Sequence, residues 1–344
     1  MKRYALIRLG IIGAGAVAQF HARAAAALPG AEMVAVCDLL LDAAQMVAEP
    51  LGAAVYTDYR SMYEQAALDA VIVNTPHSLH LEMVLAAAEA GIHVLVEKPM
   101  ATSLEDCRLM TESCSRAGIT LVVGHIQHFL PEKAAAETFL RSGALGQLLM
   151  IRDYRSTDYR PGTRPDWFFD PSVAGGGALM NIGGHCIDRS LWLGDSPVDT
   201  VDARMLNRFG VPVETDGSVR LLLRNGVEVN IVIVSDPPHR ADEILLICEQ
   251  GSISCTPDRG TVVRHNGSST TLCEPSPTGI QDGFTAQLSD FVETLHGSHP
   301  KVSNSHARSV VETVLAAYRS ALTRRVVALP EPAAPANLEN ALGR

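Results

Sequence analysis

The chain has 344 residues, a length that corresponds to about two domains of ordinary size. Apolar residues make up 47% of the sequence and charged residues 19%, which excludes a disordered or fibrous protein. The net charge is −10 and there is no basic run, so we expect no nucleic-acid partner.

The first 125 residues alternate short, mostly apolar runs with longer segments of helical spacing. Short apolar runs are typical of strands that are buried on both faces of a sheet. The runs are Leu9–Ile12, Met33–Val36, Ala70–Val73, Ile92–Val96 and Ile119–Val123. Helical spacing lies between them, as at Leu79–Ala90 and Leu104–Ala117. Since strands that alternate with helices form right-handed βαβ units, residues 1–126 are predicted to fold as a doubly wound parallel α/β domain.

After about residue 145 the pattern becomes that of antiparallel strands joined by tight turns. Asn225-Gly226 lies between the runs Val219–Arg224 and Val227–Val234, and this pair is typical of a type I′ hairpin. His265-Asn266-Gly267 predicts a second turn of the same kind. Further strands are predicted at Val201–Leu206, Glu243–Cys248 and Thr261–Arg264. Two later apolar stripes predict helices, so residues 127–328 are expected to form a second α/β domain, followed by a loose tail at 329–344.

A glycine-rich turn at residues 13–18 follows the first predicted strand and precedes a helix. In its G-x-G-x-x-A pattern, Gly13 permits the tight turn and Gly15 lets the backbone approach a pyrophosphate. N–H groups at the start of the helix face such an anion, and we expect contacts from Ala16 and Val17. Asp38 ends the second strand, where a carboxylate accepts both ribose hydroxyls of NAD and repels the 2′-phosphate of NADP. The sequence therefore predicts NAD as the cofactor in preference to NADP.

Two further predicted strands end in polar residues, at the edge where ligands of a doubly wound sheet bind. The fourth strand runs into Asn74-Thr75-Pro76-His77 and the fifth into Glu97-Lys98-Pro99. A capping threonine and a solvated ion pair are the alternatives, but the position at this edge favours a functional role. His77 and His80 have H-x-x-H spacing without a third ligand nearby, so we expect them to face the cofactor and predict no metal site.

Three glycines at residues 175–177 open a segment of helical spacing that extends over 178–193. Asn181, His185 and Asp188 share one face of this predicted helix. We expect Asp188 to hold the imidazole of His185 in one tautomer, and His185 to act as the base for a hydroxyl proton. A purely structural role for a lone helical histidine is the alternative.

Together these motifs resemble the glucose–fructose oxidoreductase/inositol dehydrogenase/MocA family, over nearly the whole chain to about residue 325. The residues that carry the resemblance are G-x-G-x-x-A at 13–18, Asp38, Asn74-Thr75-Pro76 with His80, Glu97-Lys98-Pro99, and Gly175-Gly176-Gly177 with His185-Cys186-Ile187-Asp188. The resemblance implies a Rossmann-type NAD-binding domain, followed by an α/β domain with a large, mostly antiparallel open sheet. Members of the family are mostly NAD(P)-dependent enzymes that act on secondary hydroxyls of sugars, sugar derivatives and cyclitols.

The resemblance also implies roles for individual residues. Lys98 and His185 would form the catalytic pair, with Lys98 hydrogen-bonding the reacting hydroxyl and His185 relaying its proton. Many members carry Asp where this chain has Asn181, which cannot accept a proton but can orient a hydroxyl through its amide. Trp167 matches a family position near the nicotinamide. The other expected cofactor contacts are Asn74, Thr75, His77, His80, Glu97 and Lys98.

Four arginines fall within 13 residues, at positions 152, 155, 160 and 164. Arginine forks match carboxylates and phosphates, so we expect Arg155 and Arg164 to bind an anionic group of the substrate, together with Lys98, Asn181 and His185. The alternative is that the arginines pair with the aspartates interleaved among them, at positions 153, 158, 166 and 170.

The predicted function is therefore NAD-dependent oxidation of a secondary hydroxyl on a sugar, sugar derivative or cyclitol. Two alternatives keep the fold: a glycosidase that retains NAD and uses a transient oxidation, and a non-catalytic NAD-binding regulator, against which Lys98 argues. Seven cysteines without a C-x-x-C pair favour a reducing cytoplasm, and no stretch reaches the roughly 18 apolar residues of a membrane span. Because an open sheet must cover its second face, a homodimer or homotetramer through that face is expected.

Overall fold

The computed structural model describes residues 6–238 and 240–330. Its first part contains a six-stranded sheet in the order β3-β2-β1-β4-β5-β6, with all strands parallel. The strands are β1 (Ile7–Ile12), β2 (Ala31–Cys37), β3 (Ala54–Tyr56), β4 (Ala70–Val73), β5 (His93–Glu97) and β6 (Leu121–Gly124). The predicted doubly wound topology is confirmed. No apolar run predicts β3, because this edge strand has three residues and none of them is fully buried.

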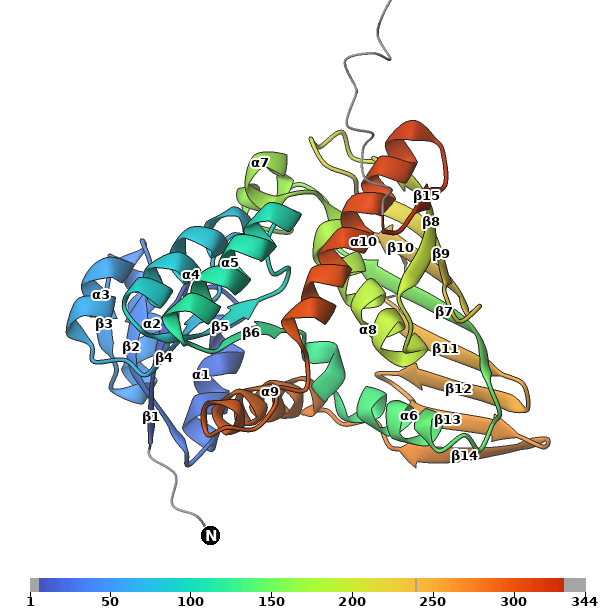
Figure 1. Ribbon diagram of the computed structural model, residues 1–344, viewed down its shortest axis with the longest axis horizontal. Helices are drawn as coiled ribbons and strands as arrows, with labels where there is room; N and C mark the ends of the chain where they lie inside the picture. The colour runs from blue at the N-terminus through green and yellow to red at the C-terminus, as the bar shows by residue number, and fades with distance from the viewer. Residues whose placement is uncertain (1–5, 239, 331–344) are drawn as a thin grey trace, which may run out of the picture.

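Helices cover both faces of this sheet (Figure 1). They are α1 (Ala18–Ala27), α2 (Leu41–Ala48), η1 (Glu49–Leu51), α3 (Tyr59–Gln65), η2 (His77–Leu79), α4 (His80–Glu89) and α5 (Leu104–Ala117). A helix from the far end of the chain, α9 (Gly279–Leu295), completes one of the two cores by placing Phe284 and Leu288 beside Leu9. Local spacing predicts α9 as an amphipathic helix, but only the tertiary structure shows that it packs on the first sheet.

The second sheet has nine strands in the order β14-β13-β12-β11-β7-β10-β9-β8-β15. Its strands are β7 (Leu148–Thr157), β8 (Val198–Leu206), β9 (Asp216–Leu223), β10 (Glu228–Ser235), β11 (Asp242–Cys248), β12 (Gly251–Thr256), β13 (Gly260–His265), β14 (Ser268–Cys273) and β15 (Val327–Ala328). Neighbouring strands are antiparallel except β7 and β10, which run parallel. The expected large and mostly antiparallel sheet is therefore confirmed.

The two predicted tight turns have different geometries. Asn266 and Gly267 join β13 to β14 with φ of +51° and +74°, as a type I′ turn requires. Between β9 and β10 only Gly226 has a positive φ, so the type I′ prediction at Asn225-Gly226 is wrong. The Asn225 side chain is held by a hydrogen bond to the Gly194 carbonyl (2.9 Å), and the connection widens to four residues.

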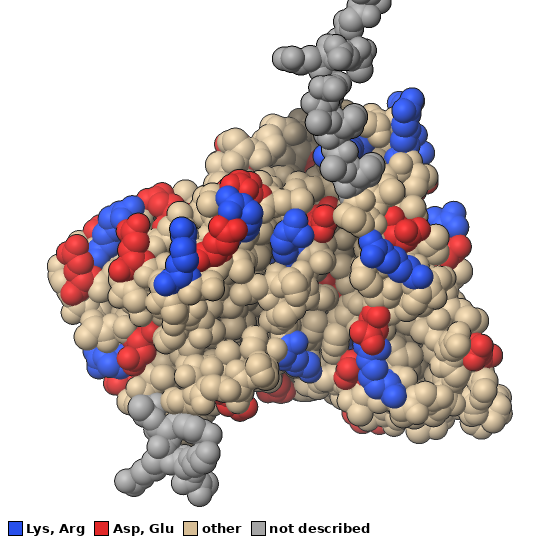
Figure 2. Space-filling model, in the orientation of Figure 1, with Lys and Arg blue, Asp and Glu red and all other residues tan. Residues whose placement is uncertain are grey.

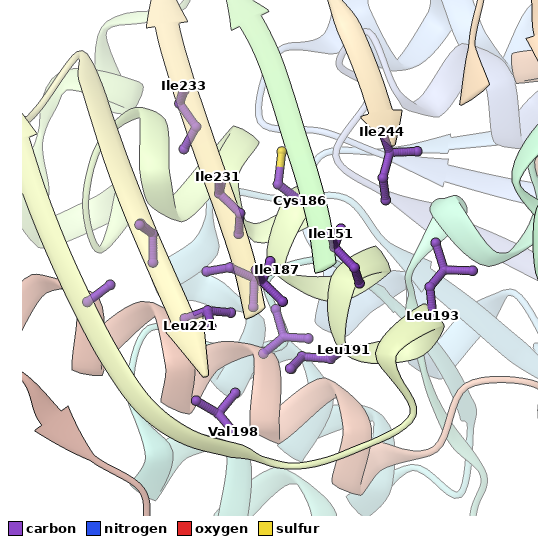
Figure 3. Close-up of a cluster of buried hydrophobic side chains, with 14 of the residues drawn as sticks. Ile151, Cys186, Ile187, Leu191, Leu193, Val198, Leu221, Ile231, Ile233 and Ile244 are labelled. Atoms are coloured by element: carbon purple, nitrogen blue, oxygen red, sulfur yellow. The ribbon is translucent and has the colours of Figure 1, made fainter. Parts of the chain in front are cut away.

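Helices α6 (Pro131–Arg141), α8 (Gly184–Gly194) and α10 (Asn304–Thr323) lie on the inner face of the second sheet (Figure 1). Figure 3 shows Ile187 and Leu191 of α8 lying against Ile151 of β7 and Ile231 of β10. Burial of each such side chain contributes about 1.5–3 kcal/mol, which fixes α8 on the sheet. The predicted helix at 178–193 is divided, since a π-helical turn, η5 (Leu179–Gly183), precedes α8. Such turns are frequent at functional sites.

Three short helical segments lie between the two parts, namely η3 (Ile126–Phe129), η4 (Asp166–Phe169) and α7 (Pro171–Ala174). Segment η3 links β6 to α6, whereas η4 and α7 follow β7 and contact η2. The long helix α10 contacts both cores, with Ala307 and Val311 in the first and Val310 and Val314 in the second. The two sheets are thus joined by one continuous packed helix.

The described chain ends at the start of the predicted tail. Leu329 is buried, and its N–H donates to the Asp199 carbonyl (2.8 Å). The rest of the predicted loose tail, from residue 331, lies outside the described residues. On the face shown in Figure 2, acidic and basic side chains lie interspersed. Among the described residues, no helix is both long enough and apolar enough to span a bilayer.

Candidate functional site

The glycine-rich turn between β1 and α1 allows close approach of a ligand. Gly13 has a φ of +90°, and a side chain there would lie 2.8 Å from the backbone of Asn74. Nothing lies within 4 Å of the position that a Cβ of Gly15 would take. Ala16 and Val17 are exposed, and α1 begins without a side-chain cap or an acidic residue in its first turn. The turn therefore offers backbone N–H groups to an anion such as a pyrophosphate.

Asp38 lies directly beside this turn. One of its carboxylate oxygens accepts the N–H of Ala14 (2.7 Å), and the other accepts the N–H of Leu40 (2.9 Å). These bonds hold the carboxylate at the end of β2, and each oxygen keeps a lone pair for a ribose hydroxyl.

The end of β4 carries buried polar atoms that lack partners. Both polar side-chain atoms of Asn74 and the hydroxyl of Thr75 are buried without a hydrogen bond. Because buried polar groups in folded proteins are nearly always satisfied, this set indicates that a ligand completes the site. The ribose hydroxyls and carboxamide of NAD are suitable partners, so the residues present fit the predicted cofactor.

The two histidines of the H-x-x-H pair lie in different surroundings. His77 is buried, its Nδ1 lies 2.7 Å from the Ala174 carbonyl, and its ring packs edge-on against Trp167 (5.1 Å between centroids). His80 is also buried, and both ring nitrogens lie 3.0 Å from backbone carbonyls, those of Pro99 and Thr75. His80 thus links the two loops after β4 and β5, and its nitrogens are occupied by protein.

Lys98 lies at the end of β5 and reaches η5. Its Nζ donates to both oxygens of Asn181, the side-chain Oδ1 (2.9 Å) and the backbone carbonyl (3.1 Å). Burial lowers the pKa of Lys98 to about 8, while the neighbouring Glu97 opposes this shift and Arg155 and Arg164 add to it. The amine of Lys98 is therefore still mostly protonated at pH 7 and loses its charge as the pH rises through about 8.

Glu97 precedes Lys98 in the chain, and its carboxylate is held by two hydrogen bonds. Its carboxylate accepts a hydrogen bond from His21 of α1 (2.9 Å) and one from the Lys98 N–H (3.2 Å). Burial raises the pKa of Glu97, but His21 and Lys98 outweigh that effect and hold it below the usual range. Glu97 thus remains an anion that connects the start of α1 to the end of β5.

His185 lies in the first turn of α8, and its Nδ1 is buried without a partner. Burial lowers the pKa of His185 well below its ordinary value, and the charges on Lys98 and Arg155 lower it further. The imidazole is therefore neutral at pH 7 and able to accept a proton.

Asp188 does not hydrogen-bond to His185, so the predicted tautomer-fixing contact is wrong. Its Oδ1 instead faces His128 (2.9 Å) and His306 (2.7 Å). The helix α8 is buried on all sides, so residues three positions apart meet different elements. The charge on Lys98, at the ligand edge of the first sheet, acts on His185 and lowers its pKa, while Asp188 contacts η3 and α10.

The segment that carries Asn181 is anchored by residues that the sequence patterns do not single out. The carboxylate of Glu214 accepts the N–H groups of Gly177 (3.0 Å) and Leu179 (2.8 Å) and the hydroxyl of Tyr318 (2.7 Å). Burial raises the pKa of Glu214 above its ordinary value. A side chain at Gly176 would overlap the Tyr318 ring, since its Cβ would lie 2.0 Å from the hydroxyl oxygen. The glycines therefore let Glu214 and Tyr318 hold the start of η5.

The four clustered arginines separate in the structure. Arg152 is exposed on the outer face of β7, and Arg160 pairs with Asp236 (3.3 Å). Arg155 points to the inner face, where its Nη1 is buried without a partner and its closest carboxylate oxygen, on Asp242, is 3.9 Å away. Arg164 donates to the Asp158 carbonyl (2.7 Å) and to a threonine hydroxyl.

The alternative, pairing of the arginines with the interleaved aspartates, is not what the structure shows for Asp153, Asp158 and Asp170. Asp153 forms a bidentate pair with the buried Arg189 of α8 (2.6 and 2.7 Å), and Asp158 pairs with Arg240. Asp170 caps α7 instead. Two arginines, 155 and 164, thus remain near Lys98 without a close carboxylate partner among the described residues.

The arrangement can perform acid–base chemistry on a hydroxyl. It combines a cation whose pKa is about 8, a neutral imidazole and an amide, next to a glycine-rich turn and an acidic strand end. Such a set can polarise an alcohol and remove its proton, provided that a second molecule accepts the electrons.

Comparison with known proteins places this site in context. A family model described as an oxidoreductase family with an NAD-binding Rossmann fold matches residues 7–125, and the GFO/IDH/MocA C-terminal domain matches residues 134–254. The chain is 30% identical over 342 residues to inositol 2-dehydrogenase 2 of Saccharopolyspora erythraea, a match that covers 95% of this chain and 97% of that protein.

Two further relatives differ in the ligands that their names give. The chain is 31% identical over 244 residues to 1-carboxy-3-chloro-3,4-dihydroxycyclohexa-1,5-diene dehydrogenase of Comamonas testosteroni, which covers 70% of this chain and 60% of that relative. The structure is also similar to the WlbA dehydrogenase of Bordetella pertussis, solved in complex with NADH and UDP-GlcNAcA. That match has a TM-score of 0.81 and 25% identity, and it covers 95% of this chain and 99% of the other.

Proposed function

Since the chain belongs to the GFO/IDH/MocA oxidoreductases, whose N-terminal domain binds NAD, we propose that it oxidises a secondary hydroxyl of a sugar, sugar derivative or cyclitol at Lys98, Asn181 and His185. The observation that carries the proposal is the contact of the Lys98 ammonium with Asn181 (2.9 Å), beside a neutral imidazole and at the ligand edge of the first sheet. NAD, when bound, supplies the electron acceptor.

Lys98 acts on the hydroxyl oxygen. Two of its three N–H groups donate to Asn181, which fixes the ammonium and leaves the third for the substrate. A cation at that oxygen stabilises the negative charge that develops as the proton leaves. Asn181 therefore positions the ammonium, and its amide N–H groups are available to a second hydroxyl of the ring.

His185 takes the proton. Burial and the nearby cations keep the imidazole neutral, and its Nδ1 has no hydrogen-bond partner among the described residues, which supports a role as proton acceptor. When the proton moves from the neutral alcohol to the neutral imidazole, a positive charge appears on His185 and an equal negative charge develops on the substrate oxygen, next to the ammonium of Lys98.

Arg155 gives the site a preference for anionic substrates. Its Nη1 is buried without a partner, and an unpaired buried donor on a cation is costly unless a ligand satisfies it. Arg164 lies nearby with only neutral acceptors, and its guanidinium covers the ring of Tyr159 (4.8 Å). A carboxylate or phosphate on the ring would pair with these two guanidinium groups. The relative from Comamonas testosteroni is named for a carboxylated ring, which supports this substrate class.

A substrate panel read by NADH absorbance tests the proposal. It should contain inositols, neutral sugars, uronic acids and sugar phosphates, each with NAD. We expect Lys98→Ala and His185→Ala each to lower kcat at least about a hundredfold on the best substrate, while NAD affinity changes little. The double variant should be much less than multiplicatively worse, because both residues act on one proton.

His299→Ala is the matched control, since His299 is exposed and outside the site. Near-normal turnover of His185→Ala at every pH would contradict the proposed proton transfer. Release of the aglycone from an added aryl glycoside, without net NADH, would indicate the NAD-retaining glycosidase instead.

A further inference from the structure

A second cluster of histidines lies behind the site, where η3, α8 and α10 meet. Nε2 of His128, Nε2 of His306 and Nδ1 of His125 lie 2.9, 2.7 and 3.3 Å from the same atom, Oδ1 of Asp188. Asp188 is fully buried, His125 and His128 are almost so, and the side chain of His306 is 20% exposed. None of these contacts is used in the proposed oxidation.

Hydrogen bonds alone satisfy this cluster poorly. Three ring nitrogens crowd one carboxylate oxygen, while the second oxygen of Asp188 is buried without a partner. Nε2 of His125 and Nδ1 of His128 are also buried and unpartnered. Each such group costs about 1–3 kcal/mol. A cation held by the carboxylate of Asp188 would offset its buried charge and can also use the free Oδ2, whereas the two unpartnered histidine nitrogens are not among its ligands.

We propose that His128, Asp188 and His306 form a binding site for a divalent first-row transition metal ion, for which Zn²⁺ is the reference. The three ligand atoms, one from each residue, lie within 4.8 Å of one another. Tetrahedral ligands at zinc distances lie roughly 3.3 Å apart, so the two nitrogen–oxygen contacts need to open by about 0.5 Å and the two nitrogens, up to 4.8 Å apart, need to close by up to about 1.5 Å.

The ligand types select the class of ion. Two imidazoles and one carboxylate favour Zn²⁺, Fe²⁺, Co²⁺ or Ni²⁺ over Mg²⁺ and Ca²⁺, which prefer sites made of oxygen atoms. His125 is the outer partner, because its Nδ1 faces the carboxylate that would hold the ion. Three protein ligands leave at least one coordination position for water or a small anion.

The ion has a route to the site. His128 and His306 line a cleft of about 870 Å³, whose other walls include Trp192 and Lys301. The His128 ring is stacked on Trp192 (4.3 Å), and His306 lies in the first turn of α10, so both ligands are held by packed elements. The open coordination position would face this cleft.

The ligands come from distant parts of the chain, which is why no motif signals the site. His128 follows the first sheet, Asp188 lies on the helix that covers the second, and His306 lies on the helix that joins them. An ion there would link η3, α8 and α10 and restrict the movement of α8, which carries His185 one turn before Asp188.

Metal titration of the chelator-treated full-length protein tests the site. We expect one equivalent of Co²⁺ to bind with visible d–d absorption, Zn²⁺ to displace it, and Zn²⁺ to raise the melting temperature. His306→Gln and His128→Gln should each weaken Zn²⁺ binding more than about a hundredfold, and His125→Gln about 10–100-fold, as is typical of outer partners.

The control is His299→Gln, an identical change at an exposed histidine outside the cluster, which should bind Zn²⁺ as the unmodified chain does. If His128→Gln fails to fold, the partly exposed His306 and the melting temperature of the unmodified protein with and without Zn²⁺ still decide the question. Absence of saturable uptake of Co²⁺, Ni²⁺ and Zn²⁺, or equal uptake by the ligand variants and the control, would overturn the proposal. The cluster would then be a hydrogen-bond network without a metal ion.

Discussion

Replacing Asn181 by aspartate should raise the pKa of Lys98 without blocking the site. Oδ1 of Asn181 lies 2.9 Å from Nζ of Lys98, and in the unmodified protein burial lowers the pKa of that ammonium to about 8. A unit negative charge at this distance, with an effective dielectric constant of about 20, contributes about 5.7 kcal/mol, or about 4 pKa units. Desolvation of the new carboxylate and repulsion from Glu97 reduce this figure, so we expect a rise of at least about one unit.

The protonated form of Lys98 is the active form in the proposed mechanism, so activity is lost as pH rises through its pKa. For the unmodified protein the alkaline limb of the kcat profile should lie near the pKa of about 8. Asn181→Asp should move this limb upward by at least about one unit, while kcat near pH 7 changes little. The measurement is the initial rate of NADH formation at saturating substrate between about pH 6 and pH 10.

Two controls separate this effect from a general change in the site. Asn181→Leu removes the side-chain acceptor and should move the limb down, and Lys98→Arg should abolish the limb because arginine stays charged. The chain has only four lysines, so ε-¹³C-lysine NMR gives the pKa of Lys98 without any substrate. An alkaline limb that stays in place or moves down in Asn181→Asp would refute the assignment of Lys98 as the acting cation.

Other predictions follow from the same contacts. NAD should bind at least about tenfold tighter than NADP, a difference of about 1.4 kcal/mol, and Asp38→Ser should reduce this difference in affinity. Fluorescence titration with each cofactor measures the two dissociation constants. Arg155→Ala should raise KM at least about tenfold for a sugar acid but not for its neutral parent, whereas Arg152→Ala, on the outer face of the same strand, should change neither. Glu214→Ala leaves three buried donors unpaired and should lower the free energy of unfolding by at least about 2 kcal/mol in a urea titration. Light scattering should give a mass of at least two chains if the open face of the second sheet is covered by another copy.

Local patterns in the sequence determine most of the first half of the fold. The run Ala70–Val73 is β4 and the segment Leu104–Ala117 is α5, with the predicted bounds. These elements are set by short-range periodicity and by a cap, Ser103, whose hydroxyl accepts the N–H of Asp106. The position of Lys98 at the ligand edge also follows from sequence, because the carboxyl ends of parallel strands meet at one edge.

Only the tertiary structure decides which residues meet around α8 and β7. The helix spacing places His185 and Asp188 on one face of the predicted helix, but α8 is buried on all sides. The two residues therefore have different neighbours: the charge on Lys98 acts on His185, and Asp188 contacts His128. Strand alternation separates Arg152 from Arg155, although four charges close in sequence look like one cluster.

Long-range packing determines the remaining parts of the site. Glu214 reaches the start of η5 across 35 residues, and His306 reaches Asp188 across 118, so neither contact has a local signal in the sequence. The helix α9 likewise completes the core of the first sheet from the far end of the chain. Periodicity determines which residues are buried, whereas the partner of a buried polar group is determined by the elements that pack against it, because each such group must find its hydrogen bond there.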